Sequence, residues 1–218
     1  MTPPLRLPSA FVALLLCLTA CSTRPHVDKA SETTASTQQA ATRIEQTSTQ
    51  IDVTMAALAD LLNNPAPNLK PQFTNYHTTL SKLESLNLTT ERDRTEMQNK
   101  FSSYLMNWDR DLSKIQNKPI HMQSLERKNA VALRYDTVRL NYIQAIAQLT
   151  PLITQLKDIR TALKVDLTVG GLAAIRSSFE KANQQAGSVH TALAGAAADI
   201  RWLSSSFSTT APETVSPH

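Results

Sequence analysis

The chain has 218 residues, only four glycines, 18% charged residues and a formal net charge of +4. Scarce glycine argues against β-sandwiches and β-barrels, which need many tight turns. It also excludes a glycine-rich phosphate loop, because the only adjacent pair is Gly170 and Gly171. The small net charge argues against nucleic acid as a partner.

Residues 1–20 have the pattern of an export signal. Arg6 supplies positive charge, residues 11–18 form a short apolar run, and Thr19 and Ala20 are small. The run is far shorter than the ~20 residues that span a bilayer. We therefore expect an exported chain whose mature part begins near Cys21.

The segment Leu18-Thr19-Ala20-Cys21 resembles the lipobox of bacterial lipoproteins. The resemblance implies that the signal is removed before Cys21 and that this cysteine carries acyl chains such as palmitate. Ser22 resembles an outer-membrane address, so the expected location is the periplasmic face of the outer membrane, with the inner membrane as the alternative. An ordinary signal peptide followed by an incidental cysteine remains open at this point.

The first helix is expected over residues 27–62, where small and apolar residues recur in alternating steps of three and four. The early positions are Thr and Ala, so residues 21–40 are expected to form the lipidated Cys21 and a tether or frayed helix start. The bundle domain is expected to cover residues 41–207. Two prolines, Pro65 and Pro67, end the first helix.

Three further helices complete the expected fold. The second covers residues 69–115, with a possible break at 87–90, and the third runs to residue 167 with a kink at Pro151. Gly170 and Gly171 are expected to give a left-handed helix end, the fourth helix covers 172–207, and residues 208–218 are expected to be disordered. The sequence thus predicts an all-α fold, an elongated antiparallel four-helix bundle or coiled coil.

Two stretches carry a further resemblance: residues 101–112, which contain Trp108 followed by spaced acids and Leu112, and residues 134–168. They resemble a "domain of unknown function" family of exported coiled-coil proteins from Gram-negative bacteria, over about residues 40–205. The resemblance implies export and a helical fold and brings no catalytic residue.

Motifs for chemistry are absent from the sequence. No glutamate is followed by histidine at the Glu-x-x-His spacing of di-iron bundles, and there is no Gly-x-Ser-x-Gly motif. We therefore predict no cofactor, no metal site and no enzymatic activity.

Two groups of side chains are candidates for a special role. Trp108, Tyr135 and Tyr142 are expected near the middle of the bundle, as core residues or as the lining of a pocket. Arg139 falls on a seam, where an unpaired charge is costly, so we expect an ion pair with Asp199 or Glu96, or a side chain that reaches solvent.

The sequence predicts a non-enzymatic, lipid-anchored periplasmic rod that acts as an envelope structural or protein-interaction module. The expected partners are the membrane, through the lipid anchor, and either a protein partner or a second copy of the chain. The alternative is a periplasmic ligand-binding or signal-sensing bundle. A cavity lined by Trp108, Tyr135 and Tyr142 would favour that alternative.

Overall fold

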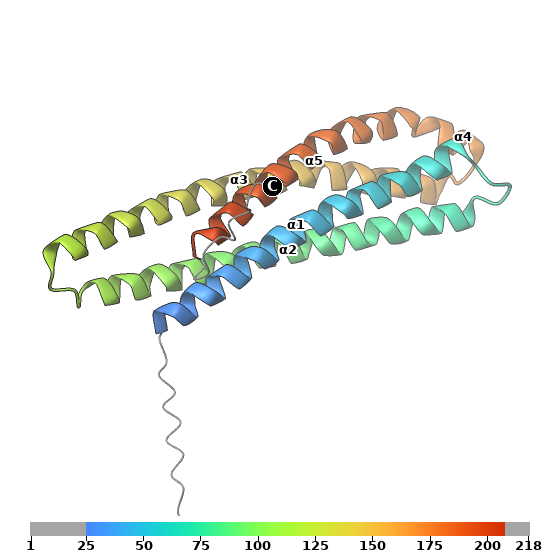
Figure 1. Cartoon of the computed structure of the whole chain (residues 1–218). Helices are drawn as coiled ribbons and strands as arrows, with labels where there is room; N and C mark the ends of the chain where they lie inside the picture. Colours follow the sequence, from blue (N-terminus) through green and yellow to red (C-terminus); the bar gives the residue numbers. More distant parts are fainter. Residues whose placement is uncertain (1–24, 208–218) are drawn as a thin grey trace, which may run out of the picture.

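The computed structural model describes residues 25–207, with side chains from residue 28 (Figure 1). Within this range the chain is helical: α1 (Pro25–Asn63), α2 (Lys70–Leu112), α3 (Lys118–Val165), the short α4 (Val169–Ala174) and α5 (Arg176–Ser205). The expected signal peptide, Cys21 and the tail 208–218 lie outside the described residues.

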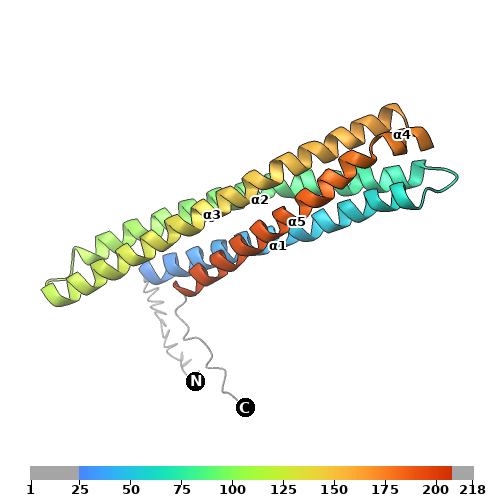
Figure 2. The same ribbon diagram turned by 90° about the horizontal axis from the view of Figure 1, so that it is seen from above.

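The four long helices lie side by side and run alternately in opposite directions (Figures 1 and 2). α1 contacts α2 and α5, and α3 contacts the same two helices, so the four form a closed ring around one core. The all-α fold class and its helical bundle are confirmed.

The core extends from the corner at α4 to the end of α5. Each long helix contributes large aliphatic side chains to the core. Examples, one from each helix, are Ile44, Leu80, Leu149 and Leu193, which are all fully buried. These residues come from stripes that recur at helical spacing, so the burial of apolar faces explains why four amphipathic segments assemble.

α1 is a regular helix from Pro25, which differs from the tether or frayed start expected for residues 21–40. Its first half packs on α2 through small side chains, among which Thr33 and Thr37 are fully buried. The Thr37 hydroxyl donates to the carbonyl of Thr33 at 2.6 Å, so its polar group is satisfied within the helix. Small residues let the backbones of α1 and α2 approach closely, so this half of α1 packs tightly although its seam positions are Thr and Ala rather than leucine.

α2 continues without a break through residues 87–90. Thr90, inside the possible break, donates to the carbonyl of Leu86 at 2.8 Å and lies 3.1 Å from the hydroxyl of Thr47 on α1. α3 likewise continues through Pro151. Its true cap is Asn117, whose side chain accepts from the N–H of Ile120.

The corner between α3 and α5 differs from the expected left-handed helix end. No glycine in the described part of the chain has a positive φ, and Gly170 and Gly171 form the first turn of α4. The side chain of Thr168 caps this turn by accepting from the N–H of Gly171 at 3.2 Å. A Cβ on Gly171 would lie 2.9 Å from Cγ of Asp166, so glycine is needed here for close approach rather than for an unusual backbone angle.

Candidate functional site

Tyr142 and Tyr135 lie in the core as packed side chains. The hydroxyl of Tyr142 donates to the carbonyl of Thr90 at 2.9 Å, and burial raises the pKa of this phenol well above its usual value. Tyr135 stacks on Phe101 with ring centroids 3.7 Å apart, and burial raises the pKa of Tyr135 to about 12. Both phenols therefore stay neutral and act as core residues.

Trp108 is separate from the two tyrosines. Its Nε1 donates to Oγ of Ser124 at 3.0 Å, near the connection between α2 and α3. Ser124 precedes Tyr142 by eighteen residues on α3, which corresponds to about 27 Å at 1.5 Å per residue. The three aromatic residues are thus spread along the bundle and do not surround a common cavity.

An aromatic cluster closes the core where α5 ends. Phe207 packs edge-on against both Phe101 and Tyr104, with ring centroids 5.8 and 5.3 Å apart. Tyr104 also meets Trp108 at 5.4 Å. This cluster joins α2 and α3 to Phe207, two residues after α5, so its main effect is to fix the end of α5 on the bundle.

Arg139 pairs with Asp136 on its own helix, with its Nε 3.6 Å from Oδ1, rather than with Asp199 or Glu96. Asp199 accepts instead from the side-chain amide of Asn141 at 2.8 Å. For Glu96 the reason is the register of α2 and α3.

Three contacts across these helices define that register: Tyr76 with Leu156, Thr90 with Tyr142, and Trp108 with Ser124. Each pair is symmetrical about residue 116, which places Arg139 at the level of Asp93 rather than Glu96.

Two ion pairs that the sequence did not reveal join neighbouring helices. Arg160 binds Glu84 through two nitrogens at 2.9 and 3.0 Å, which links α3 to α2. Asp93 is only 4% exposed and accepts from Nε of Arg43 and from the amide of Gln39, both at 2.9 Å. Because a buried charge is tolerated only with partners, Asp93 fixes α2 against α1.

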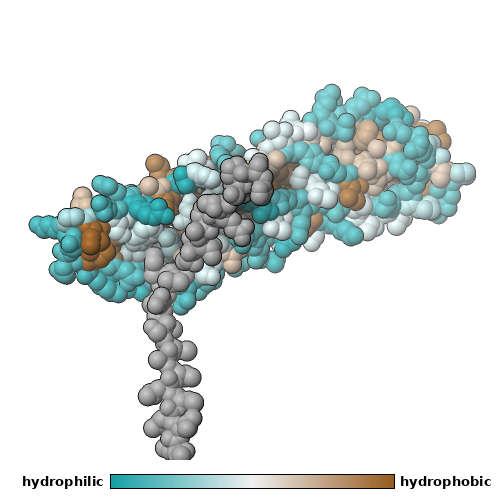
Figure 3. Space-filling view, in the orientation of Figure 1, coloured by the Kyte–Doolittle hydropathy of each residue, from teal (hydrophilic) through white to brown (hydrophobic). Residues whose placement is uncertain are grey.

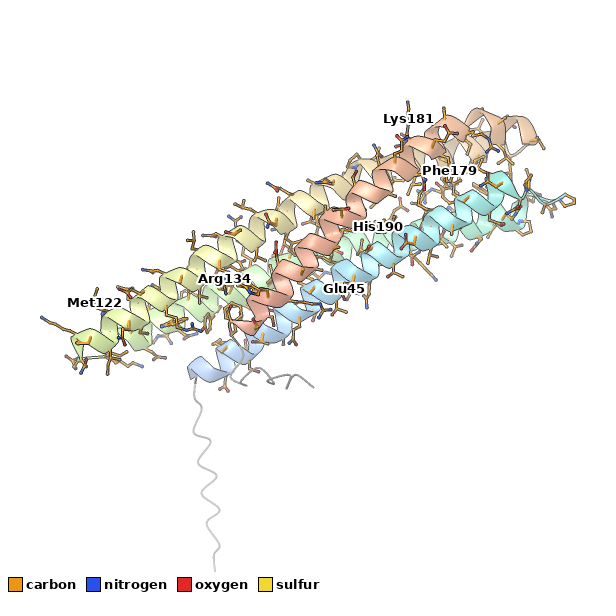
Figure 4. All side chains as sticks on the ribbon, turned by 45° about the horizontal axis from the view of Figure 1, so that its top comes forward. Glu45, Met122, Arg134, Phe179, Lys181 and His190 are labelled. Carbon is orange, nitrogen blue, oxygen red and sulfur yellow. The ribbon has the colours of Figure 1, made fainter. Side chains whose placement is uncertain are left out.

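Ser48, His190 and Asp52 form a chain of hydrogen bonds between α1 and α5. Oγ of Ser48 lies 2.7 Å from Nδ1 of His190, whose Nε2 lies 2.9 Å from Oδ1 of Asp52. Figure 4 shows His190 on α5, alongside α1. Ser48 and Asp52 are four residues apart, a spacing that places them on one helix face, but only the register brings His190 to them.

These three residue types also occur in hydrolytic triads, so the surroundings of Ser48 matter. An acyl-transfer site needs free backbone N–H groups that point at the developing oxyanion. Ser48 lies in the middle of α1, where backbone N–H groups are bonded along the helix. The trio therefore joins two helices, and its geometry does not provide an oxyanion hole.

A surface groove of about 390 Å³ runs between α3 and α5. The guanidinium of Arg134 lies 3.0 Å above the ring centre of Trp202, a cation–π contact that forms one wall. Leu133 and Asp199 also line the groove. It is shallow and open, and it contains none of the three aromatic residues that the sequence offered as pocket lining.

In the described part of the chain, no three His, Cys, Asp or Glu side chains are grouped so as to hold a metal ion. Within the same residues, no helix combines the length and apolar character that crossing a bilayer requires. A family model described as a protein of unknown function (DUF2959) matches residues 26–200. No curated protein and no solved structure matches the chain.

Proposed function

The chain belongs to the DUF2959 family, whose function is unknown, and we propose that it is a non-enzymatic, lipid-anchored helical rod in the bacterial periplasm. It is held on the periplasmic face of the outer membrane and acts as an envelope structural or protein-interaction module. The observation that carries this proposal is one continuous core that fills the elongated bundle from the corner at α4 to the end of α5.

The dimensions of the bundle suit a spacer. α3 has 48 residues, which corresponds to about 72 Å of continuous helix. Cross-helix contacts occur along its length, from Trp108 with Ser124 to Arg160 with Glu84. A rod that is joined at many levels resists bending and holds its two ends at a fixed separation.

The anchor is proposed from the sequence around Cys21. Four peptide steps separate Cys21 from Pro25, where α1 begins. Such a segment spans at most about 14 Å even when fully extended. Acylation of Cys21 would hold the start of the bundle close to the lipid surface, and two or more acyl chains give a stable anchor where one does not.

The ligand-sensing alternative has less support. It requires space between the helices near Tyr135 and Tyr142, but both side chains are packed, and Tyr142 is fully buried. The groove beside Trp202 is on the surface between two helices. A ligand there would contact the rod without opening its core.

The proposal is tested by replacing Cys21 with alanine in the full chain. We expect wild-type protein to incorporate a palmitate analogue and to sediment with membranes, whereas Cys21→Ala should be unlabelled. If export and cleavage continue, the variant should appear in the soluble periplasmic fraction with an unchanged helical circular dichroism spectrum. A wild-type chain whose measured mass contains no acyl group would contradict the anchor.

A further inference from the structure

The connection between α2 and α3 extends beyond the other helices. Thr33 on α1 donates to the carbonyl of Lys100 on α2 at 3.3 Å, so these residues lie at one level. From there α1 has eight more residues to Pro25 and α2 has twelve to Leu112, so α2 reaches about 6 Å further at 1.5 Å per residue. Residues 113–117 extend the projection.

The same hairpin also passes the end of α5. Arg134 on α3 contacts Ser206 at 3.2 Å, just after α5 ends. Sixteen residues separate Arg134 from Lys118, where α3 begins, so the hairpin extends about 24 Å beyond α5. Figure 2 shows this two-helix projection, and Figure 4 shows Met122 near its end, far from Arg134.

Residues 106–122 are called the hairpin tip. They expose apolar side chains that no other helix covers: Ile120 is 54% exposed, Met122 is 53% exposed and Met106 is 61% exposed. Figure 3 shows a hydrophobic patch at this end of the bundle, surrounded by hydrophilic residues.

The projection is also basic. Residues 106–134 contain six Lys or Arg and three Asp or Glu, so they account for three of the four net positive charges of the chain. Lys114, Lys118 and Ile120 are all exposed. Asp109 and Asp111 are paired with Lys128 and Lys114 respectively, and Lys118 has no ion-pair partner among the described residues.

Apolar side chains beside exposed cations are suited to an anionic lipid surface. The apolar groups enter the boundary between headgroups and acyl chains, and each lysine near the surface is attracted by the negative potential. A protein partner would also cover apolar residues, but the excess of positive charge favours a negatively charged headgroup layer.

We propose that the hairpin tip contacts the headgroup layer of the anionic membrane that holds the anchor, through Ile120, Met122, Lys114 and Lys118. This inference rests on the proposed anchor at Cys21. The tip reaches beyond the start of α1, and α1 itself starts within about 14 Å of the acylated residue. Two contacts then fix the direction of the rod, and the corner that contains α4 points away from the membrane.

The test places an environment-sensitive fluorophore at Met122 in the full chain, as processed by the cell and reconstituted into vesicles. The variant is Met122→Cys, and mass spectrometry first establishes whether Cys21 is acylated. The matched control is Val165→Cys, because Val165 is also an exposed apolar residue (86%) and lies at the opposite end. On α3 the two positions are about 65 Å apart at 1.5 Å per residue.

In vesicles that contain phosphatidylglycerol, we expect the probe at residue 122 to shift to shorter wavelength and to be quenched by a lipid-borne quencher. The probe at residue 165 should do neither. Lys114→Gln and Lys118→Gln should each weaken the tip's contact about fivefold, and replacing the anionic lipid by phosphatidylcholine should weaken it about 25-fold. Circular dichroism of each variant shows whether the bundle is folded.

A water-like spectrum at residue 122 in an acylated, folded protein would overturn the proposal. So would a blue shift that is independent of lipid and insensitive to the lipid-borne quencher, because that result indicates contact with a second copy. If mass spectrometry finds no acyl group but added anionic vesicles still quench residue 122, the anchor fails and the contact of the tip stands.

Discussion

The corner between α3 and α5 provides a sharp test of the fold, because two adjacent glycines meet different surroundings there. A methyl group on Gly171 would lie 2.9 Å from Cγ and 3.0 Å from the backbone carbon of Asp166, and closer still to its carbonyl oxygen. A methyl group on Gly170 would meet nothing nearer than Oγ1 of Thr168 at 3.5 Å, an ordinary van der Waals distance.

The expected magnitudes follow from two opposing effects. Alanine is favoured over glycine inside a helix by up to about 1 kcal/mol. Overpacking against atoms that cannot rotate away costs about 1–3 kcal/mol, and two of the atoms that Gly171→Ala would meet belong to the backbone. We therefore expect Gly170→Ala to be neutral or to stabilise by up to about 1 kcal/mol, and Gly171→Ala to destabilise by about 1–2 kcal/mol.

The measurement is denaturant-induced unfolding of both variants and the wild type, followed by far-UV circular dichroism. A change in the midpoint at constant slope reports a change in stability. If Gly171→Ala were as stable as Gly170→Ala, the close approach between α4 and Asp166 would not exist as described, and the reason given for glycine at this corner would fail.

Two further predictions concern ion pairs. The side chains of Glu84 and Arg160 are 27% and 13% exposed, whereas those of the equally bidentate pair Glu45 and Arg201 are 48% and 50% exposed. Because water weakens exposed ion pairs, a double-mutant cycle should give a coupling energy of about 1 kcal/mol for Glu84 and Arg160 and a smaller one for Glu45 and Arg201. Equal coupling energies would show that burial does not strengthen the pair of Glu84 and Arg160 relative to the exposed pair. The Arg201 guanidinium beside Glu45 lowers the pKa of that carboxyl below 4.5. Its stabilising contribution is therefore complete above pH 4.5 and is lost as the pH falls through the folded-state pKa. Glu45→Gln should make the free energy of unfolding less dependent on pH in that acidic range, whereas Glu126→Gln, at an exposed residue without an ion pair in the described part of the chain, should not. An unchanged pH profile for Glu45→Gln would contradict the pairing.

The helices and the core faces could be predicted from the sequence because both depend on local spacing. Ile44, Leu80, Leu149 and Leu193 lie on apolar stripes that recur at helical spacing, and all four are buried. The prolines at 65 and 67 lie in the connection that follows α1. Periodicity is less informative where the stripe consists of small polar residues, so the first half of α1 was expected to be weaker than it is.

The contacts between helices could not be predicted in this way, because they depend on register. Three contacts between α2 and α3 are symmetrical about residue 116, and this register could not be read from either helix alone. Arg139 pairs within α3, while Arg160 reaches Glu84. The residues that flank Arg160 and Glu84 in the sequence do not indicate that these two side chains meet.

The sequence by itself determined that four segments would be helical and which of their faces would avoid water, since each residue's place on a helix follows from its spacing to the next. Only the tertiary structure decided which polar groups meet across those faces and that the hairpin tip extends past the ends of α1 and α5. The physical reason is that helix length and position along the bundle are set by packing and turn geometry, which act between segments far apart in the chain.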